Sequence, residues 1–214
     1  MNRALAFAFL IGVSVFAIGE ISQAAEGPKV VAEGKWSKPV VDKDGYAVRG
    51  RLVLCEKVVP DDRRHVSVYI ELQDVCDFVS SSGMQLYCDL GRNDFRPEYK
   101  GGLRCELRDQ DQKIIEPRGY PFGGAVPLSE WVRLPTDATI RLRSTPFGIS
   151  GAKAMAISPE LGQMWEIADG DSSEYFLSGT FTIDPAAELV PTGEGHVWRG
   201  TIELPAMKIV NDRK

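Results

Sequence analysis

The segment from residue 64 to residue 74, RHVSVYIELQD, constrains the fold more than any other stretch of the chain. Side chains of a β-strand point to opposite faces in turn, so strict alternation of apolar and polar residues predicts a strand with one dry and one wet face. A single strand cannot bury its dry face alone, and sheets are therefore expected. The apolar positions are Val66, Val68, Ile70 and Leu72, and the polar positions are Ser67, Tyr69, Glu71 and Gln73.

Similar short runs recur along the chain, with turn residues between them. An Asp-Gly turn at Asp44 and Gly45 joins two β-branched, apolar runs, and Pro135 breaks another pair of runs. Two more alternating runs, joined by a loop rich in proline and glycine, lie between residues 174 and 205. This pattern predicts an all-β fold, an antiparallel immunoglobulin-like β-sandwich.

One stretch departs from the β pattern and predicts a short helix in a long loop. Ser158 suits the N-cap position and Pro159 the first helical position. Leu161, Trp165 and Ala168 then recur at helical spacing. We therefore expect a helix from Pro159 to Ala168 that covers an end or an edge of the sandwich.

The N-terminal segment has the pattern of a secretory signal peptide. Arg3 is followed by an uncharged apolar run from residue 4 to residue 18, and small residues occupy positions 22 and 24. The run is shorter than the roughly 20 residues of a membrane-spanning helix, although an uncleaved anchor is an alternative. We predict a signal peptide at 1–24, a flexible lead-in at 25–34, a single domain at 35–210, and a secreted or periplasmic protein without a stable membrane span after signal removal.

The chain has four cysteines, an even number that predicts disulfide bonds in an exported protein. Three pairings are possible, and strand alternation favours one of them. Cys88 and Cys105 share faces with leucines and could meet in the core, which leaves Cys55 to pair with Cys76. A four-thiolate zinc site is the competing interpretation, but the spacing contains no CxxC motif.

The formal net charge of −5 argues against a nucleic-acid partner, because positive and negative residues are interspersed and no basic face is evident. No cofactor motif is present, and no cofactor is expected.

Four motifs resemble a known group of proteins. They are WSKPV from Trp36, VRGRL from Val48, LPTDATI from Leu134 and YFLSGTFTI from Tyr175. In this order they resemble exported immunoglobulin-like sandwich proteins of planctomycete-type bacteria, over roughly residues 36 to 209. The resemblance implies the fold and an exported location and brings no catalytic residue with it. The chain lacks the Cys and Trp spacing of antibody-type domains.

Candidate chemistry begins with the two histidines, His65 and His196. No GxSxG motif is present and neither histidine lies in an HExxH motif, so both are interpreted as residues at strand ends. Paired carboxylates for glycoside hydrolysis remain conceivable on neighbouring strands. Those carboxylates are Glu71, Asp89, Glu106 and Asp109. The sequence therefore predicts no catalytic residue.

Three acidic clusters could bind a hard cation, namely residues 42–45, 61–64 and 169–174. The first and third resemble the beginning of a calcium loop, but position 12 of such a loop falls on Val53 or Thr180, where a bidentate glutamate is required. All three are interpreted as turns whose polar side chains cap the backbone or pair with each other. No metal site is expected.

Aromatic residues on loops are the candidate ligand-binding residues. Tyr120, Phe122 and Trp131 flank a segment rich in glycine and proline, and aromatics at a sandwich end can stack on sugar rings or anchor a protein. The sequence favours an exported, non-catalytic binding or structural module of the cell envelope, whose partner is an envelope protein or a polysaccharide. The alternative is a small secreted hydrolase or metal-dependent enzyme with a site assembled from loops.

Overall fold

The described part of the chain is all-β. The computed structural model describes residues 29–58, 64–77, 83–88, 102–119, 130–143, 154–158, 163–168, 171, 173–185 and 195–210. No helix occurs within these ranges, which confirms the all-β part of the predicted fold class. The strands are β1 (Lys29–Glu33), β2 (Val40–Val41), β3 (Ala47–Val58), β4 (Arg64–Asp74), β5 (Met84–Cys88), β6 (Gly102–Asp109), β7 (Ile114–Ile115), β8 (Arg118–Gly119), β9 (Glu130–Leu134), β10 (Thr139–Arg143), β11 (Ala154–Ser158), β12 (Gln163–Ala168), β13 (Tyr175–Ile183), β14 (His196–Val197) and β15 (Gly200–Ile209).

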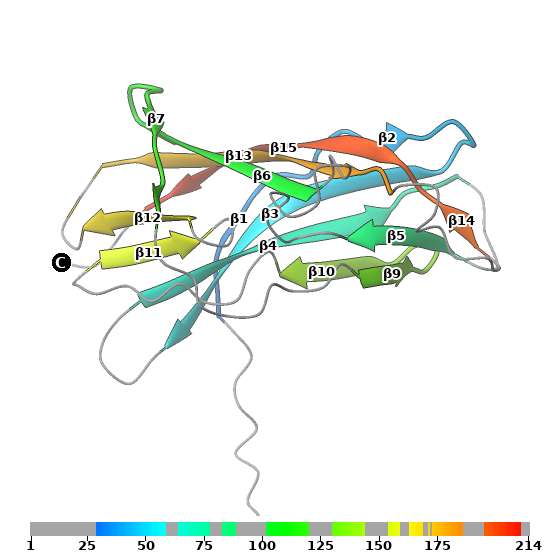
Figure 1. Ribbon diagram of the computed structural model, residues 1–214, viewed down its shortest axis with the longest axis horizontal. Coiled ribbons are helices and arrows are strands. Elements are labelled where there is room, and N and C mark those ends of the chain that lie inside the picture. The colour runs from blue at the N-terminus through cyan, green and yellow to red at the C-terminus, as the bar shows by residue number, and fades with distance from the viewer. Residues whose placement is uncertain are drawn as a thin grey trace, which may run out of the picture.

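The described strands form three sheets. The largest follows the order β1-β3-β4-β11-β12-β8, with β10 also paired to β4 and β2 also paired to β3. The second has the order β15-β13-β6-β7, and the third has the order β14-β5-β9. In Figure 1, β13 and β15 run as one layer above β3 and β4. The two layers enclose the main core.

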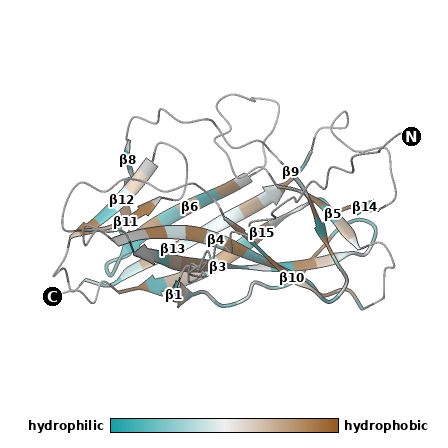
Figure 2. Ribbon diagram, turned by 90° about the horizontal axis from the view of Figure 1, so that it is seen from below, coloured by the Kyte–Doolittle hydropathy of each residue, from teal (hydrophilic) through white to brown (hydrophobic). Residues whose placement is uncertain are grey.

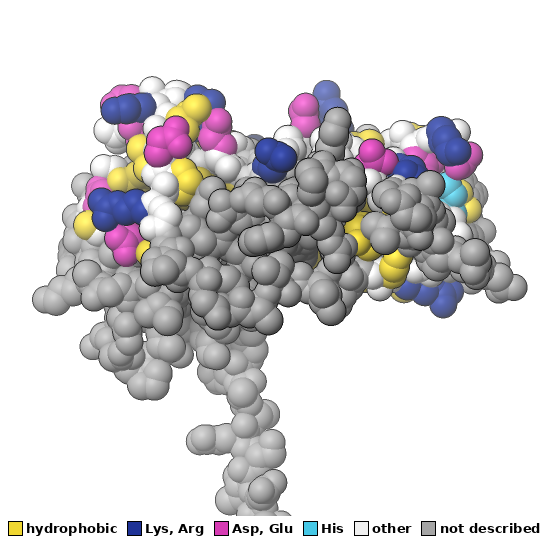
Figure 3. Space-filling model, viewed as in Figure 1, with side chains coloured by type: hydrophobic (Ala, Val, Ile, Leu, Met, Phe, Trp, Pro, Cys, Tyr) yellow, Lys and Arg dark blue, Asp and Glu magenta, His cyan; other side chains and the backbone are white. Residues whose placement is uncertain are grey.

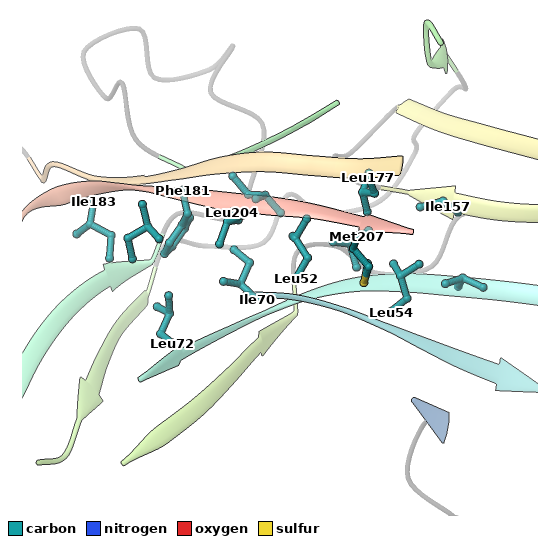
Figure 4. Packing of buried hydrophobic residues seen from close by; sticks show 14 of the residues in the cluster. Leu52, Leu54, Ile70, Leu72, Ile157, Leu177, Phe181, Ile183, Leu204 and Met207 are labelled. Atoms are coloured by element: carbon teal, nitrogen blue, oxygen red, sulfur yellow. The ribbon is translucent and has the colours of Figure 1, made fainter. Parts of the chain in front are cut away.

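The core lies between the inner faces of these two layers. Leu52 and Ile70, from β3 and β4, point toward Phe181 and Leu204 of the facing sheet (Figure 4). The sheets approach closely at Gly50, where an added Cβ would lie 3.0 Å from Cδ2 of Leu204. A side chain at this position would force the side chains of Leu204, Ile202 and Leu72 to shift.

The strand and its dry face are confirmed, because Val66, Val68, Ile70 and Leu72 are buried in the core. The other face is less exposed than predicted: Tyr69 and Gln73 are partly buried, and Ser67 and Glu71 are buried. Figure 2 shows hydrophobic and hydrophilic residues alternating along several other strands.

The last strand contains an irregularity that its sequence explains. Leu177 of β13 pairs with Met207, but Gly179 pairs with Leu204, so β15 has one extra residue at Pro205 and Ala206. Proline cannot donate a ladder hydrogen bond and is tolerated at a bulge. The extra residue shifts the alternation by one, so that Leu204 and Met207 both face the core.

The predicted helix is wrong over residues 163–168, which form strand β12; residues 159–162 lie outside the described part. β12 pairs with β11, which in turn pairs in parallel with β4. Met164, Trp165 and Ile167 are all buried, and the indole nitrogen of Trp165 donates to the carbonyl of Ile115 at 2.7 Å. A sheet partner from a distant segment therefore overrides the local helical spacing.

Two further predictions differ from the described strands. Lys29–Glu33, within the expected flexible lead-in, form β1 because the edge of β3 offers them a partner. The β4–β11 and β5–β14 pairs are parallel, whereas an entirely antiparallel sandwich was expected. Parallel pairs need long connections between their strands, which local patterns do not reveal.

The predicted Cys55–Cys76 disulfide is not formed. Sγ of Cys76 accepts a hydrogen bond from the amide of Ala47 at 3.1 Å, so Cys76 lies beside the first residue of β3. Cys55 is eight residues further along the same strand. At about 3.3 Å for each step this is about 26 Å, far beyond the roughly 7 Å Cα separation that a disulfide tolerates. Burial raises the pKa of the Cys76 thiol to about 11. The side chain of Cys88 lies outside the described part, and no disulfide is present among the described cysteines.

Candidate functional site

The turn between β2 and β3 organises a polar cluster around one buried carboxylate. Oδ1 of Asp42 accepts hydrogen bonds from the amides of Asp44 and Tyr46, both at 3.0 Å. Gly45 closes the turn with a φ of 90°, a conformation that glycine adopts without steric cost. Only 3% of the Asp42 side chain is exposed. The Asp-Gly turn predicted from the sequence therefore also holds a carboxylate in a fixed orientation.

His196, on β14, adds a nitrogen donor to this turn. Its Nε2 lies 2.5 Å from Oδ2 of Asp42, and its Nδ1 lies 3.7 Å from Oδ2 of Asp44. The imidazole stacks on the ring of Tyr46 with a centroid separation of 3.9 Å and an interplanar angle of 5°. The ring is thus fixed both in its plane and across its face.

Trp198 packs in the core beneath the turn and is hydrogen-bonded to Tyr46. It is fully buried, and its indole nitrogen donates to the carbonyl of Tyr46 at 3.1 Å. The backbone amide of Trp198 in turn donates to the carbonyl of Gln85 on β5, so Trp198 connects the turn to the third sheet. In the space-filling view a histidine lies at the surface beside acidic and basic side chains, at the end of the molecule that carries β2 and β14 (Figure 3).

Asp42, Asp44 and His196 place ligand atoms within 4.8 Å of one another. A histidine nitrogen combined with carboxylate oxygens is a donor set that zinc and similar transition metals accept. Among the described hydrogen bonds of His196 and Asp42, none involves a serine, threonine or cysteine side chain that could act as a nucleophile. The cluster therefore resembles a ligand set more than a hydrolase triad.

His65 lies near one end of the largest sheet, whereas His196, on β14 of the third sheet, contacts the turn at the other end. His65 pairs with Lys57 near the end of β3, whereas His196 contacts the turn that precedes Ala47. Ten steps along β3 separate these two positions, which corresponds to about 33 Å. The side chain of His65 lies outside the described part. The enzyme alternative predicted that the two histidines, or carboxylates such as Glu71 and Asp89, converge around a pocket, and the strand register keeps the histidines apart.

Glu71, a carboxylate candidate for glycoside hydrolysis, is held between two arginines on the outer face of the largest sheet. It accepts hydrogen bonds from Arg51 at 2.6 Å and from two nitrogens of Arg141 at 2.8 and 2.5 Å. Burial raises the pKa of Glu71, but the hydrogen bonds from the two arginines outweigh burial and hold the pKa below its ordinary value. Glu71 is therefore a fixed anion rather than a proton donor at neutral pH.

The same outer face carries an aromatic and cationic array that the sequence analysis missed. The guanidinium carbons of Arg49 and Arg51 lie 5.0 and 4.8 Å from the ring centroid of Trp36. Arg49 also donates from Nε to Gln73 at 2.8 Å, and Arg51 donates to Glu33 at 2.9 Å. We call Trp36, Arg49 and Arg51 the tryptophan–arginine array. Alternate polar positions on β3 were a usable signal, because such residues share one face.

Of the three aromatic ligand candidates, only Trp131 lies within the described residues. It is partly buried on β9 and contacts Tyr87 of β5, with ring centroids 5.1 Å apart. Tyr120 and Phe122 lie outside the described part, and the ligand role of all three stays a prediction.

The other acidic candidates act as turn caps or ion pairs where the structure describes them. Oδ1 of Asp109 accepts from the amides of Asp111 and Lys113. Asp171 accepts from the amide of Ser173 and from the hydroxyl of Tyr175. Glu106 pairs with Arg108 at 2.5 Å. Asp89 and residues 61–63 lie outside the described part.

A comparison with protein-family models, curated proteins and solved structures found no match to the chain. Within the described ranges, no helix is long and apolar enough to cross a membrane.

Proposed function

We propose that the protein is an exported, non-catalytic β-sandwich module that binds a protein or polysaccharide of the cell envelope. The observation that carries this proposal is the tryptophan–arginine array on the outer face of the largest sheet. Tryptophan and arginine are the residue types most enriched where binding energy concentrates. Both can also stack on sugar rings or pair with acidic groups.

The array is preorganised, which favours binding over a purely structural role. Gln73 accepts a hydrogen bond from Arg49. Glu33 and Glu71 both accept hydrogen bonds from Arg51. Side chains held in place before binding lose less conformational entropy when a partner arrives. Arg49 has no carboxylate partner among the described residues, so its terminal nitrogens can pair with an anionic group.

Export is supported by the signal-like pattern of residues 1–24, and it remains part of the proposal. An immunoglobulin-like topology is likewise proposed only in part. The facing sheets and the antiparallel β13–β15 pair support it, while the parallel β4–β11 pair departs from it.

The proposal is tested by affinity capture from an envelope extract of the source cell with immobilised residues 25–214. Protease digestion or periodate oxidation of the extract identifies the retained component as protein or polysaccharide. Arg49→Ala should abolish retention, because it removes both the stacked guanidinium and the candidate anion contact. Arg104→Ala is the matched control, since Arg104 is an exposed arginine on β6 of the other layer.

Trp131→Ala separates this surface from the aromatic loop predicted by the sequence. A component lost with Arg49→Ala but kept with Arg104→Ala and Trp131→Ala supports the proposal. Loss with Trp131→Ala alone would move the binding surface to the loop, and equal retention by all variants would reject binding through either surface.

A further inference from the structure

We propose that His196 and Asp44 bind a divalent transition-metal cation, best matched by zinc, and that Asp42 is the residue that orients the histidine. The proposal does not depend on the function proposed above, because the site lies at the turn between β2 and β3 and not at the tryptophan–arginine array.

Nδ1 is the nitrogen of His196 that is available to bind a metal. Oδ2 of Asp42 lies 2.5 Å from Nε2, and a carboxylate only accepts hydrogen bonds. The proton of a neutral ring is therefore placed on Nε2, which leaves the lone pair on Nδ1. A carboxylate that accepts from the far nitrogen of a metal-binding histidine is a recurrent arrangement, because it fixes the tautomer and raises the basicity of the ligand.

The carboxylate of Asp42 is held in a fixed orientation by the turn. The Asp42 side chain is 3% exposed, and its other oxygen accepts two backbone amides of the turn. Both oxygens are therefore engaged, so Asp42 is expected to orient the ring rather than to coordinate the cation. The stacked ring of Tyr46 restricts rotation of the His196 imidazole out of this plane.

The two proposed ligand atoms lie close to the separation that a zinc ion requires. Nδ1 of His196 and Oδ2 of Asp44 are 3.7 Å apart. Two ligands of a tetrahedral zinc ion at ordinary bond lengths lie about 3.4 Å apart. A small movement of Asp44, whose side chain is 48% exposed, closes the difference. Water can complete the coordination at this exposed side.

The donor set also selects the kind of cation. Calcium and magnesium prefer oxygen ligands, whereas imidazole suits zinc and its neighbours. Lys43 lies 4.0 Å from Oδ2 of Asp44, but its side chain is 83% exposed. A surface ion pair of this kind contributes little and can be displaced.

The test is a titration of tag-free residues 25–214 with zinc chloride, followed by NMR of the imidazole nitrogens and by calorimetry. We expect the Nδ1 resonance of His196 to shift, while the ring of His65 is unaffected. Calcium chloride should leave both rings unchanged.

The variants assign the ligands. Asp44→Asn replaces an anionic ligand at an exposed position by a neutral amide, without removing any histidine or thiol, and it should weaken zinc binding at least tenfold. Asp42→Asn should weaken binding by about 10- to 100-fold, as loss of an orienting carboxylate does in other zinc sites. Asp111→Asn, in an exposed acidic turn without a histidine, is the matched control and should change nothing.

Unfolding curves establish that each variant is folded. If Asp42→Asn does not fold, Asp44→Asn still tests the proposal. Absence of a His196 shift, or zinc binding that Asp44→Asn leaves intact, would overturn the proposal. His196 would then serve only to pair with the two carboxylates of the turn.

Discussion

Two turns of this molecule have the same local design and different surroundings. Residues 42–46 and 109–113 both begin with an aspartate whose Oδ1 accepts amides two and four residues later. In both, the first amide donates to the last carbonyl, at 2.9 and 3.0 Å. In both, the fourth residue has a positive φ, 90° at Gly45 and 63° at Gln112.

The surroundings distinguish the two turns. Asp42 is buried and contacts His196, whereas the second turn projects beyond β6 and β7 with exposed residues at its tip. Capping of the turn therefore explains the aspartate in both places, but it does not explain why a histidine from β14 stacks on the first. A short acidic turn of this kind therefore becomes a candidate site only when a distant segment brings a further ligand to it.

The largest expected effect comes from removing the support beneath the first turn. Trp198→Ala should lower the free energy of unfolding by about 3–5 kcal/mol, because it leaves a cavity in the core and frees the carbonyl of Tyr46. Urea denaturation measures the change. Trp131→Ala, at a partly buried position on β9, should cost about 1–2 kcal/mol. Equal losses in the two variants would contradict the anchoring role of Trp198.

The two aspartates that begin the turns provide the second test. Asp109→Ala should cost about 1 kcal/mol, because it removes capping hydrogen bonds at a partly exposed site. Asp42→Ala should cost about 2–3 kcal/mol, since it also leaves Nε2 of His196 without its acceptor. Urea denaturation of both variants decides the matter. Equal costs would mean that the histidine adds nothing to the first turn.

Substitutions at the fourth position of the two turns should change the free energy of unfolding in opposite directions. Gly45→Ala should destabilise by about 1 kcal/mol, because an alanine is strained at a φ of 90° even though no atom lies within 4 Å of its Cβ. Gln112→Gly should stabilise by a few tenths of a kcal/mol to about 1 kcal/mol, because it relieves the same strain. Thermal unfolding of the pair reports both signs. Destabilisation by Gln112→Gly would show that the positive φ of Gln112 does not strain the second turn.

The smallest effect is expected at a third aspartate, which caps a turn and contacts a tyrosine instead of a histidine. The hydrogen bonds from Ser173 and Tyr175 hold the pKa of Asp171 below its ordinary value of 3.8. A lowered pKa in the folded state contributes stability above the unfolded pKa, and this contribution disappears as the pH falls through the folded pKa. Asp171→Asn should therefore be slightly less stable than the wild type at pH 7.

Equilibrium unfolding at neutral and strongly acidic pH tests this expectation. The difference between Asp171→Asn and the wild type should vanish at acidic pH. A difference that persists there would mean that the asparagine changes the turn for another reason.

The sequence predicted those parts of the fold that depend on local pattern. Alternation placed Val66 through Leu72 on β4, and Pro135 was expected to end a strand, as it does between β9 and β10. The turn at Gly45 was also predicted, because its residues favour the required dihedral angles.

The remainder depends on pairings between distant segments. Helical spacing around Trp165 was misleading because β11 offered β12 a partner. The cysteine prediction considered which way each side chain faces but not where along the sheet it lies. The site was missed for the same reason, since Asp42 and His196 are 154 positions apart.

The pairing of β13 has a consequence for how the chain folds. β6, at residues 102–109, lies between β7 and β13, and β13 in turn pairs with β15. The layer that closes the core is therefore incomplete until residues 175–209 are available. Contacts of such sequence separation slow folding, because loop-closure entropy is lost before the pairing compensates for it. A growing chain is thus expected to stay unfolded until residues 175–209 have emerged, and shortened chains that lack β15 should be substrates for chaperones and proteases.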